Sequence, residues 1–201
     1  MSIDGAVAGF APSPLSPVTV KGTAVVALAK FVEDTLTAEE RERALASLSP
    51  EDRRLFDRHL ILPVDLFPLA AVNRFTIAAA REKGLPPEVF GRRVGRYAAE
   101  TAVRGPMRYL AALLTPAALL ARASRLWSTI YSRGEMSVEV NEPAHAVLVL
   151  KDFPSEDVGC GRITGWMEKL TELTRVKDVH ARHIDCVARG AAVCRWDVRW
   201  R

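Results

Sequence analysis

The stretch RGEMSVEVNEPAHAVLVLK, residues 133–151, is where the pattern of this chain changes from helical to extended. Apolar and polar residues alternate from Met136 to Val140, which is the period of a half-buried strand. Asn141-Glu142-Pro143 predicts a turn, and His145–Lys151 predicts a second strand. The two strands are expected to pair as a hairpin.

A second hairpin is predicted at the C-terminal end of the chain. An amphipathic helix is expected over Cys160–Leu173, followed by a strand over Val179–Cys186. Apolar and charged residues then alternate from Cys194 to Trp200, and a turn containing Gly190 joins the two strands. The helix therefore crosses between two hairpins, which together make a four-stranded antiparallel sheet.

The first two thirds of the chain are predicted to be helical. Apolar residues recur at helical spacing, and Thr37 followed by Glu40 forms a capping box. Thr115-Pro116 is expected to begin a helix that runs to Ser132. Residues 1–19 have neither period and are interpreted as a flexible arm before a single α+β domain over residues 20–201, in which the helical part packs on the sheet.

Composition and charge exclude several classes of protein. With 49% hydrophobic and 26% charged residues, the chain has enough apolar side chains for a globular core. The net charge is only +4 and its basic residues are interleaved with acidic ones, so nucleic acid is not expected as a partner. Thr115-Pro116 interrupts the longest apolar stretch, so no membrane span is expected. The N-terminus lacks the positive charge of an export signal, and a cytoplasmic location is expected.

Three cysteines, an odd number, lie within a short part of the chain and are interpreted as thiols or metal ligands. Cys186 and Cys194 flank the predicted turn, and Cys160 opens the crossover helix, where a helix N-terminus favours a thiolate. His183 is the natural fourth ligand of a tetrahedral zinc ion.

This ligand set makes a geometric demand on the strand that carries the histidine. Residues three apart on a regular strand face opposite sides, so the strand must bulge or end near Asp185 if His183 and Cys186 are to converge. His180 competes for the ligand role, but an alternating strand turns it away from His183. The alternative to a metal site is that the cysteines are small buried hydrophobic residues.

The segments CGRITGW (160–166), HIDCVARG (183–190) and CRW (194–196) resemble the 4-vinyl reductase domain family. The resemblance extends over residues 85–201 and is most specific from 160 to 200. It implies a fold shared with the vesicle-tethering TRAPP subunits and, more distantly, with haem-nitric-oxide-binding domains.

The resemblance also implies a set of metal ligands. In the similar sensor domains of phenol-responsive regulators, three cysteines and a glutamate bind structural zinc. The cysteine positions correspond to Cys160, Cys186 and Cys194, and the glutamate position falls on His183. Three cysteines and a histidine are themselves a common zinc set, so the departure leaves the coordination intact.

An apolar ligand pocket between the helices and the sheet is implied as well. The expected wall residues are Trp127, Ile130, Tyr131 and Trp166. The alternative is that these side chains are ordinary core, as large aromatic residues at helical spacing usually are.

Residues and motifs that the sequence lacks bear on haem binding and on catalysis. Residues 60–144 contain no histidine to act as an axial ligand, so haem is not expected. No glycine-rich phosphate loop, nucleophile elbow or His-Glu-x-x-His pair is present, so the protein is not expected to be an enzyme. A Cys-His nucleophile remains as an alternative, although metal ligation would consume its thiolate.

The expected function is therefore binding. The first interpretation is a zinc-stabilised, ligand-sensing regulatory domain that binds a small apolar molecule, forms a homodimer and signals to a separate partner protein. The alternative is a TRAPP-like protein adaptor without a small ligand. A basic series could contact an acidic partner or be a solvated face, and its members are Arg92, Arg93, Arg96, Arg104 and Arg108.

Overall fold

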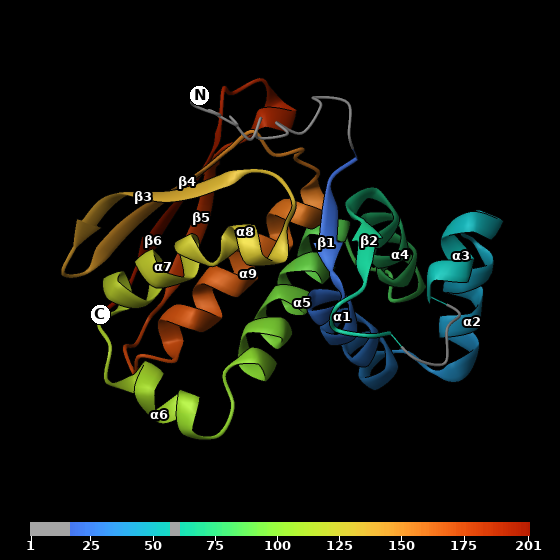
Figure 1. Ribbon diagram of the computed structural model, residues 1–201, viewed down its shortest axis with the longest axis horizontal. Coiled ribbons are helices and arrows are strands. Elements are labelled where there is room, and N and C mark those ends of the chain that lie inside the picture. The colour runs from blue at the N-terminus through green and yellow to red at the C-terminus, as the bar shows by residue number, and fades with distance from the viewer. Residues whose placement is uncertain (1–16, 57–60) are drawn as a thin grey trace, which may run out of the picture.

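The computed structural model describes residues 17–56 and 61–201. It has helices in the first two thirds of the chain and a four-stranded antiparallel sheet after them, so the predicted α+β class is confirmed (Figure 1). Most of the predicted arm, residues 1–16, lies outside the described residues. The last residue of that arm, Thr19, begins a short strand.

A small two-stranded sheet near the N-terminus was not predicted. Strand β1 (Thr19–Lys21) pairs antiparallel with β2 (Leu66–Pro68), and the N–H of Leu69 donates to the carbonyl of Val18 beside it. The buried residues Val20 and Phe67 lie opposite each other and join the core of the helical half. The β1–β2 pair therefore holds residues 18–21 against the beginning of the helix that starts at Leu69.

The helices of the first half form where the caps and apolar spacing indicate. Thr37 and Glu40 make both bonds of the predicted capping box, which is confirmed. The predicted helix from Pro116 to Ser132 is broken at Leu126, where Trp127 turns into the core and its indole N–H donates to the Arg133 carbonyl at 3.1 Å. The helices are α1 (Gly22–Thr35), α2 (Ala38–Ala46), α3 (Pro50–Phe56), α4 (Leu69–Glu82), α5 (Pro87–Ala102), α6 (Pro106–Ala112), α7 (Pro116–Arg125) and α8 (Trp127–Ile130).

The large sheet has the strand order β3-β4-β6-β5, with every neighbouring pair antiparallel. Each predicted hairpin is present, and the β4–β6 pair joins them in the middle of the sheet. The strands are β3 (Glu135–Glu142), β4 (His145–Lys151), β5 (His180–Asp185) and β6 (Cys194–Arg199), and α9 (Asp157–Glu172) crosses between the hairpins.

The β5–β6 register shifts between His183 and Asp185, so the predicted bulge is confirmed. It lies beside the predicted metal ligands and ends the regular strand just before Cys186.

Helices α5 and α9 pack with their backbones in contact, through two glycines on each. A Cβ on Gly95 would lie 1.9 Å from the carbonyl oxygen of Arg162, and one on Gly165 would lie 1.9 Å from that of Arg92. Gly91 and Gly161 make similarly close approaches. Only glycine permits this separation, and it fixes the position of α9 and of the cysteine near its start.

Two arginines of the basic series reinforce the same contact. Arg92 binds the buried carboxylate of Glu168 through Nε at 2.9 Å and through Nη2, and Arg96 binds Glu172 at 2.8 Å. Glu168 also accepts from the N–H of Ala181 in β5 at 3.2 Å. These two arginines therefore help to hold α5 against α9, while part of each side chain stays exposed to solvent.

Over residues 17–56 and 61–201, the molecule contains no helix with the length and apolar character needed to cross a bilayer.

Candidate metal centre

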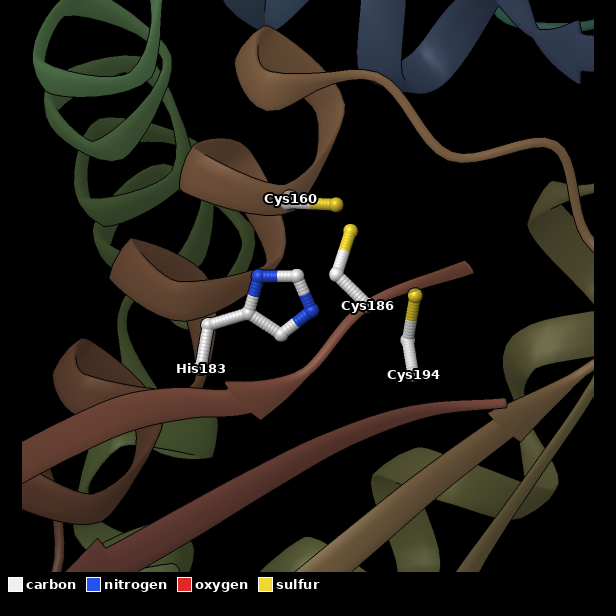
Figure 2. Close-up of side chains that lie close together, drawn as sticks. All are labelled: Cys160, His183, Cys186 and Cys194. Carbon is white, nitrogen blue, oxygen red and sulfur yellow. The ribbon is translucent and has the colours of Figure 1, made fainter. Parts of the chain in front are cut away.

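Four side chains, one from α9 and three from the β5–β6 hairpin, converge at the N-terminal end of α9 (Figure 2). The ligand atoms of Cys160, His183, Cys186 and Cys194 all lie within 4.8 Å of one another. The three cysteines are free thiols and buried, and the histidine is half-buried. A tetrahedron with bonds of about 2.3 Å has edges of about 3.8 Å, so a small contraction would bring these atoms to the spacing of a four-coordinate ion.

The local backbone explains why residues distant along the chain meet here. Cys160 lies in the first turn of α9, where its N–H donates to the carbonyl of Glu156. The bulge in β5 turns His183 and Cys186 to the same side. A short 3₁₀ turn, Val187–Arg189, and Gly190, with φ of +89°, then return the chain to Cys194 at the start of β6.

The thiol of Cys160 is in a strongly perturbed environment. Burial raises its pKa, and the neighbouring Cys186 and Cys194 raise it further. The thiol is therefore protonated at neutral pH when no cation is present. A divalent cation reverses this balance, because it supplies the positive charge that stabilises the thiolate.

The surroundings of His183 favour its neutral form. Burial lowers its pKa, and the positive charge of Arg189 lowers it further. Its ring stacks on the indole of Trp196, with centroids 4.5 Å apart and planes 11° from parallel. Its Nε2 atom is buried and has no hydrogen-bond partner among the described residues. A buried, unpartnered imidazole nitrogen facing three thiols fits a bound metal ion.

Two polar groups approach the sulfur of Cys194. The Val187 backbone N–H donates to its sulfur at 3.4 Å, and the Ser155 hydroxyl lies 2.9 Å from the same sulfur. Hydrogen bonds to the ligand atoms of a metal site typically orient and stabilise those ligands.

Sequence reasoning did not find these supporting groups. The Trp196 indole donates to Thr164 at 2.9 Å, and Thr164 donates to the carbonyl of Cys160 at 2.8 Å, so the ring that stacks on His183 is tied to α9. The alternation of β6 indicated that Trp196 was buried, but only the strand register places it opposite His183. Ser155 gave no sequence signal, since it lies in an irregular segment.

His180, the competing histidine, is exposed and lies outside the cluster. The structure thus brings together all four side chains predicted as ligands, and ligation itself remains a prediction.

The four residues predicted to line a pocket lie in different surroundings. Trp127 and Tyr131 stack at 4.3 Å, and both meet Phe153 edge-on. Ile130 packs against the core of the N-terminal helices, whereas Trp166 packs between the sheet core and a smaller cluster around α6. Three of the four therefore belong to α8 and its surroundings and one to α9, and their role as a pocket wall remains a prediction.

Comparison with known proteins identifies the fold. No protein-family model and no curated protein sequence matches the chain. Solved structures of H-NOX proteins do match. An H-NOX protein from S. oneidensis in the Fe(II)NO ligation state has a TM-score of 0.70 and 11% identity, covering 90% of this chain and 99% of that one. An unliganded Fe(II) H-NOX protein from K. algicida has a TM-score of 0.67 and 11% identity, covering 90% and 96%. A mutant H-NOX protein from T. tengcongensis has a TM-score of 0.67 and 15% identity, covering 90% and 97%.

At these identities the matches show the fold alone. The expected relation to haem-nitric-oxide-binding domains is confirmed at that level. Membership of the 4-vinyl reductase family is not shown, and the adaptor alternative gains no support from these matches.

The expectation that the protein has zinc and no haem requires a correction. The matching structures are H-NOX proteins, and another matching structure is described as modulating haem redox potential through porphyrin distortion. The exclusion of haem was therefore wrong, because it assumed that a missing histidine in one segment decides what this fold binds. Residues 60–144 still supply no histidine, so the fold and these residues disagree about an axial ligand, and none is assigned.

Proposed function

We propose that the protein is a ligand-sensing regulatory domain whose C-terminal half is fixed by a zinc ion. The observation that carries this proposal is the convergence of three buried thiols and one unpartnered imidazole nitrogen within 4.8 Å, in a fold shared with H-NOX proteins. The fold supports sensing, and the donor set supports the metal.

Zinc suits this donor set better than other common divalent ions. Thiolate and imidazole ligands select zinc, whereas calcium and magnesium require oxygen ligands. Four protein ligands leave no open position for water or substrate, as is typical of a structural site and not of a catalytic one. This supports the expectation that the protein is not an enzyme.

The residues around the cluster have distinct roles in this proposal. Cys160 contributes from α9, and the other three ligands contribute from the β5–β6 ribbon, so binding joins helix to ribbon. Trp196 holds the imidazole plane, and the Val187 N–H stabilises the negative charge on Cys194. When bound, zinc supplies the charge that keeps the thiols ionised in a buried site.

We further propose that the protein binds a small apolar ligand, forms a homodimer and signals to a separate partner protein in the cytoplasm. The sequence and its resemblance to the 4-vinyl reductase family support these features. The stack of Trp127 on Tyr131 beside α8 is where such a ligand would contact aromatic side chains.

Elemental analysis of the purified protein tests the metal. We expect close to one zinc ion per chain, and loss of that zinc in Cys186→Ser. His180→Asn is the matched control, because this histidine lies on the same strand outside the cluster and should leave the zinc content unchanged. A folded wild-type protein without metal, or a Cys186→Ser protein with full zinc, contradicts the proposal.

Two probes, phenol and haemin, test the sensing role. Saturable binding of either, followed by intrinsic tryptophan fluorescence for phenol and by the Soret band for haemin, supports a sensor. Binding of haemin would also assign the haem of the fold to this chain. If neither probe binds saturably, the sensing role is contradicted even when the metal is present.

A further inference from the structure

Helix α6 has the reverse of the usual burial pattern. It buries the small residue Ala111 against Leu170 and Leu173 of α9 and its C-terminal end. Its large apolar residues point outward instead. Met107 is 59% exposed, Tyr109 72% and Leu110 55%, and Leu113, just after the helix, is 82% exposed. We call these four residues the α6 patch.

The exposure of these four apolar side chains is unfavourable if the surface contacts only water. Single exposed apolar residues are common, but four of them within residues 107–113 indicate a surface with an apolar partner. Gly105, with φ of +57°, and Pro106 set the helix apart from α5, and α6 lies at the edge of the molecule (Figure 1). The patch is therefore accessible to a large flat partner.

Positive charge surrounds the patch. Arg104 precedes the helix, Arg108 lies on it, and both are exposed. A hollow of about 410 Å³ next to the helix is lined by Arg108, Lys169 and Arg175, together with Tyr109 of the patch. The acidic residue in its lining, Glu172, already binds Arg96 and Lys169. Glu100 lies 3.5 Å from Lys169 and 4.0 Å from Arg108, and the cations still outnumber these two carboxylates. Among the described residues, Arg104 and Arg175 form no salt bridge.

We propose that the α6 patch and its cationic hollow are a docking surface for a membrane containing anionic lipids. The four apolar side chains insert among the acyl chains at the interface, where tyrosine is favoured. The surrounding arginines extend to the lipid phosphates, and the hollow accepts a headgroup. The charge favours a lipid surface over a second copy of this chain, because two-fold contact would bring the same arginines together.

Vesicle sedimentation of the full chain tests this surface. The probes are vesicles of phosphatidylcholine alone and vesicles in which about one third of the lipid is phosphatidylserine. We expect binding to the anionic vesicles only, weakened when salt rises from about 0.1 M to about 0.5 M. The double variant Leu110→Glu, Leu113→Glu should bind at least about tenfold more weakly.

Val64→Glu is the matched control, since Val64 is 79% exposed and lies at the entrance to β2, away from α6. It should bind as the wild type does. Because all of these residues are exposed, the variants should fold, and circular dichroism checks that they do. The proposal is overturned if the wild type ignores anionic vesicles, if the double variant binds normally, or if the patch holds two copies of the chain together without lipid.

Discussion

Metal binding at one ring nitrogen of His183 competes with a hydrogen bond at the other. Nδ1 lies 3.3 Å from Nη2 of Arg189, which can only donate. A neutral imidazole that accepts at Nδ1 carries its proton on Nε2, which is the buried nitrogen without a partner among the described residues. Ligation through Nε2 requires the proton to be on Nδ1, and a protonated Nδ1 cannot accept a hydrogen bond from Arg189.

Removing that competition should strengthen metal binding. Arg189→Ala removes a donor that selects the wrong tautomer and a positive charge that opposes a dication, so we expect zinc affinity to rise by roughly three- to tenfold. Competition with a chromogenic chelator measures it. Arg182→Ala, an exposed arginine on β5, is the control. Unchanged or weaker zinc binding in Arg189→Ala would contradict this competition.

The sequence was sufficient to predict the four clustered residues but not the groups that surround them. Cysteines on both sides of a glycine turn and a histidine three residues earlier are visible as spacing. The contacts of Ser155, Val187 and Trp196 with these ligands depend on register and on irregular backbone, which spacing does not encode.

Among the elements, the contact between α5 and α9 should be the least tolerant of added volume. In Gly165→Ala, the new Cβ would lie 1.9 Å from the carbonyl oxygen of Arg92, and neither backbone can move without separating the helices. We expect a loss of at least about 2 kcal/mol in the free energy of unfolding. Urea denaturation measures it.

Gly159→Ala is the matched control on the same helix. Its Cβ would find its nearest neighbour, Nδ2 of Asn73, at 3.8 Å, which is an ordinary contact. This change should be neutral or stabilise the protein by up to about 1 kcal/mol, because alanine favours a helix. Equal losses in both variants would contradict the close approach.

The pair of Asp52 in α3 and Arg74 in α4 should make stability depend on pH. Two hydrogen bonds of 2.5 and 2.9 Å from Arg74 hold the pKa of the buried Asp52 carboxyl below its usual value. Its contribution is therefore present above the unfolded pKa of about 3.9 and is lost as pH falls through the folded pKa.

Asp52→Asn removes that contribution. We expect a loss of about 1–2 kcal/mol near pH 7, and a difference from the wild type that shrinks below about pH 4. Thermal unfolding across this pH range measures it, with the exposed neighbour Glu51→Gln as the control. A difference that is the same at pH 3 and pH 7 would rule out the ion pair as its cause.

The elements with strong periodicity were predicted well, and those without it were not. The second strand was predicted at its observed bounds, His145–Lys151, because its apolar run is bounded by a clear turn. The three-residue strands β1 and β2 are too short to show a period. At the break at Leu126, Trp127 packs against Tyr131 and Phe153. Such a tertiary contact leaves no mark in the helical spacing of the sequence.

For the whole molecule, the sequence pattern predicted the α+β architecture correctly, whereas the exclusion of haem drawn from it was wrong. Two hairpins joined by a crossover helix are enough to give a four-stranded antiparallel sheet next to a helical layer. What a fold binds depends on pocket shape and on residues brought together in space, so the absence of histidine from residues 60–144 did not justify excluding haem. The four clustered residues were found because a turn brings most of them together locally.

We propose above all that one zinc ion joins the start of α9 to the β5–β6 ribbon. X-ray absorption spectroscopy at the zinc edge of the purified protein tests it most directly. We expect three sulfur neighbours at about 2.3 Å and one nitrogen neighbour at about 2.0–2.1 Å. A shell of oxygen neighbours, or one with fewer than three sulfurs, would contradict it.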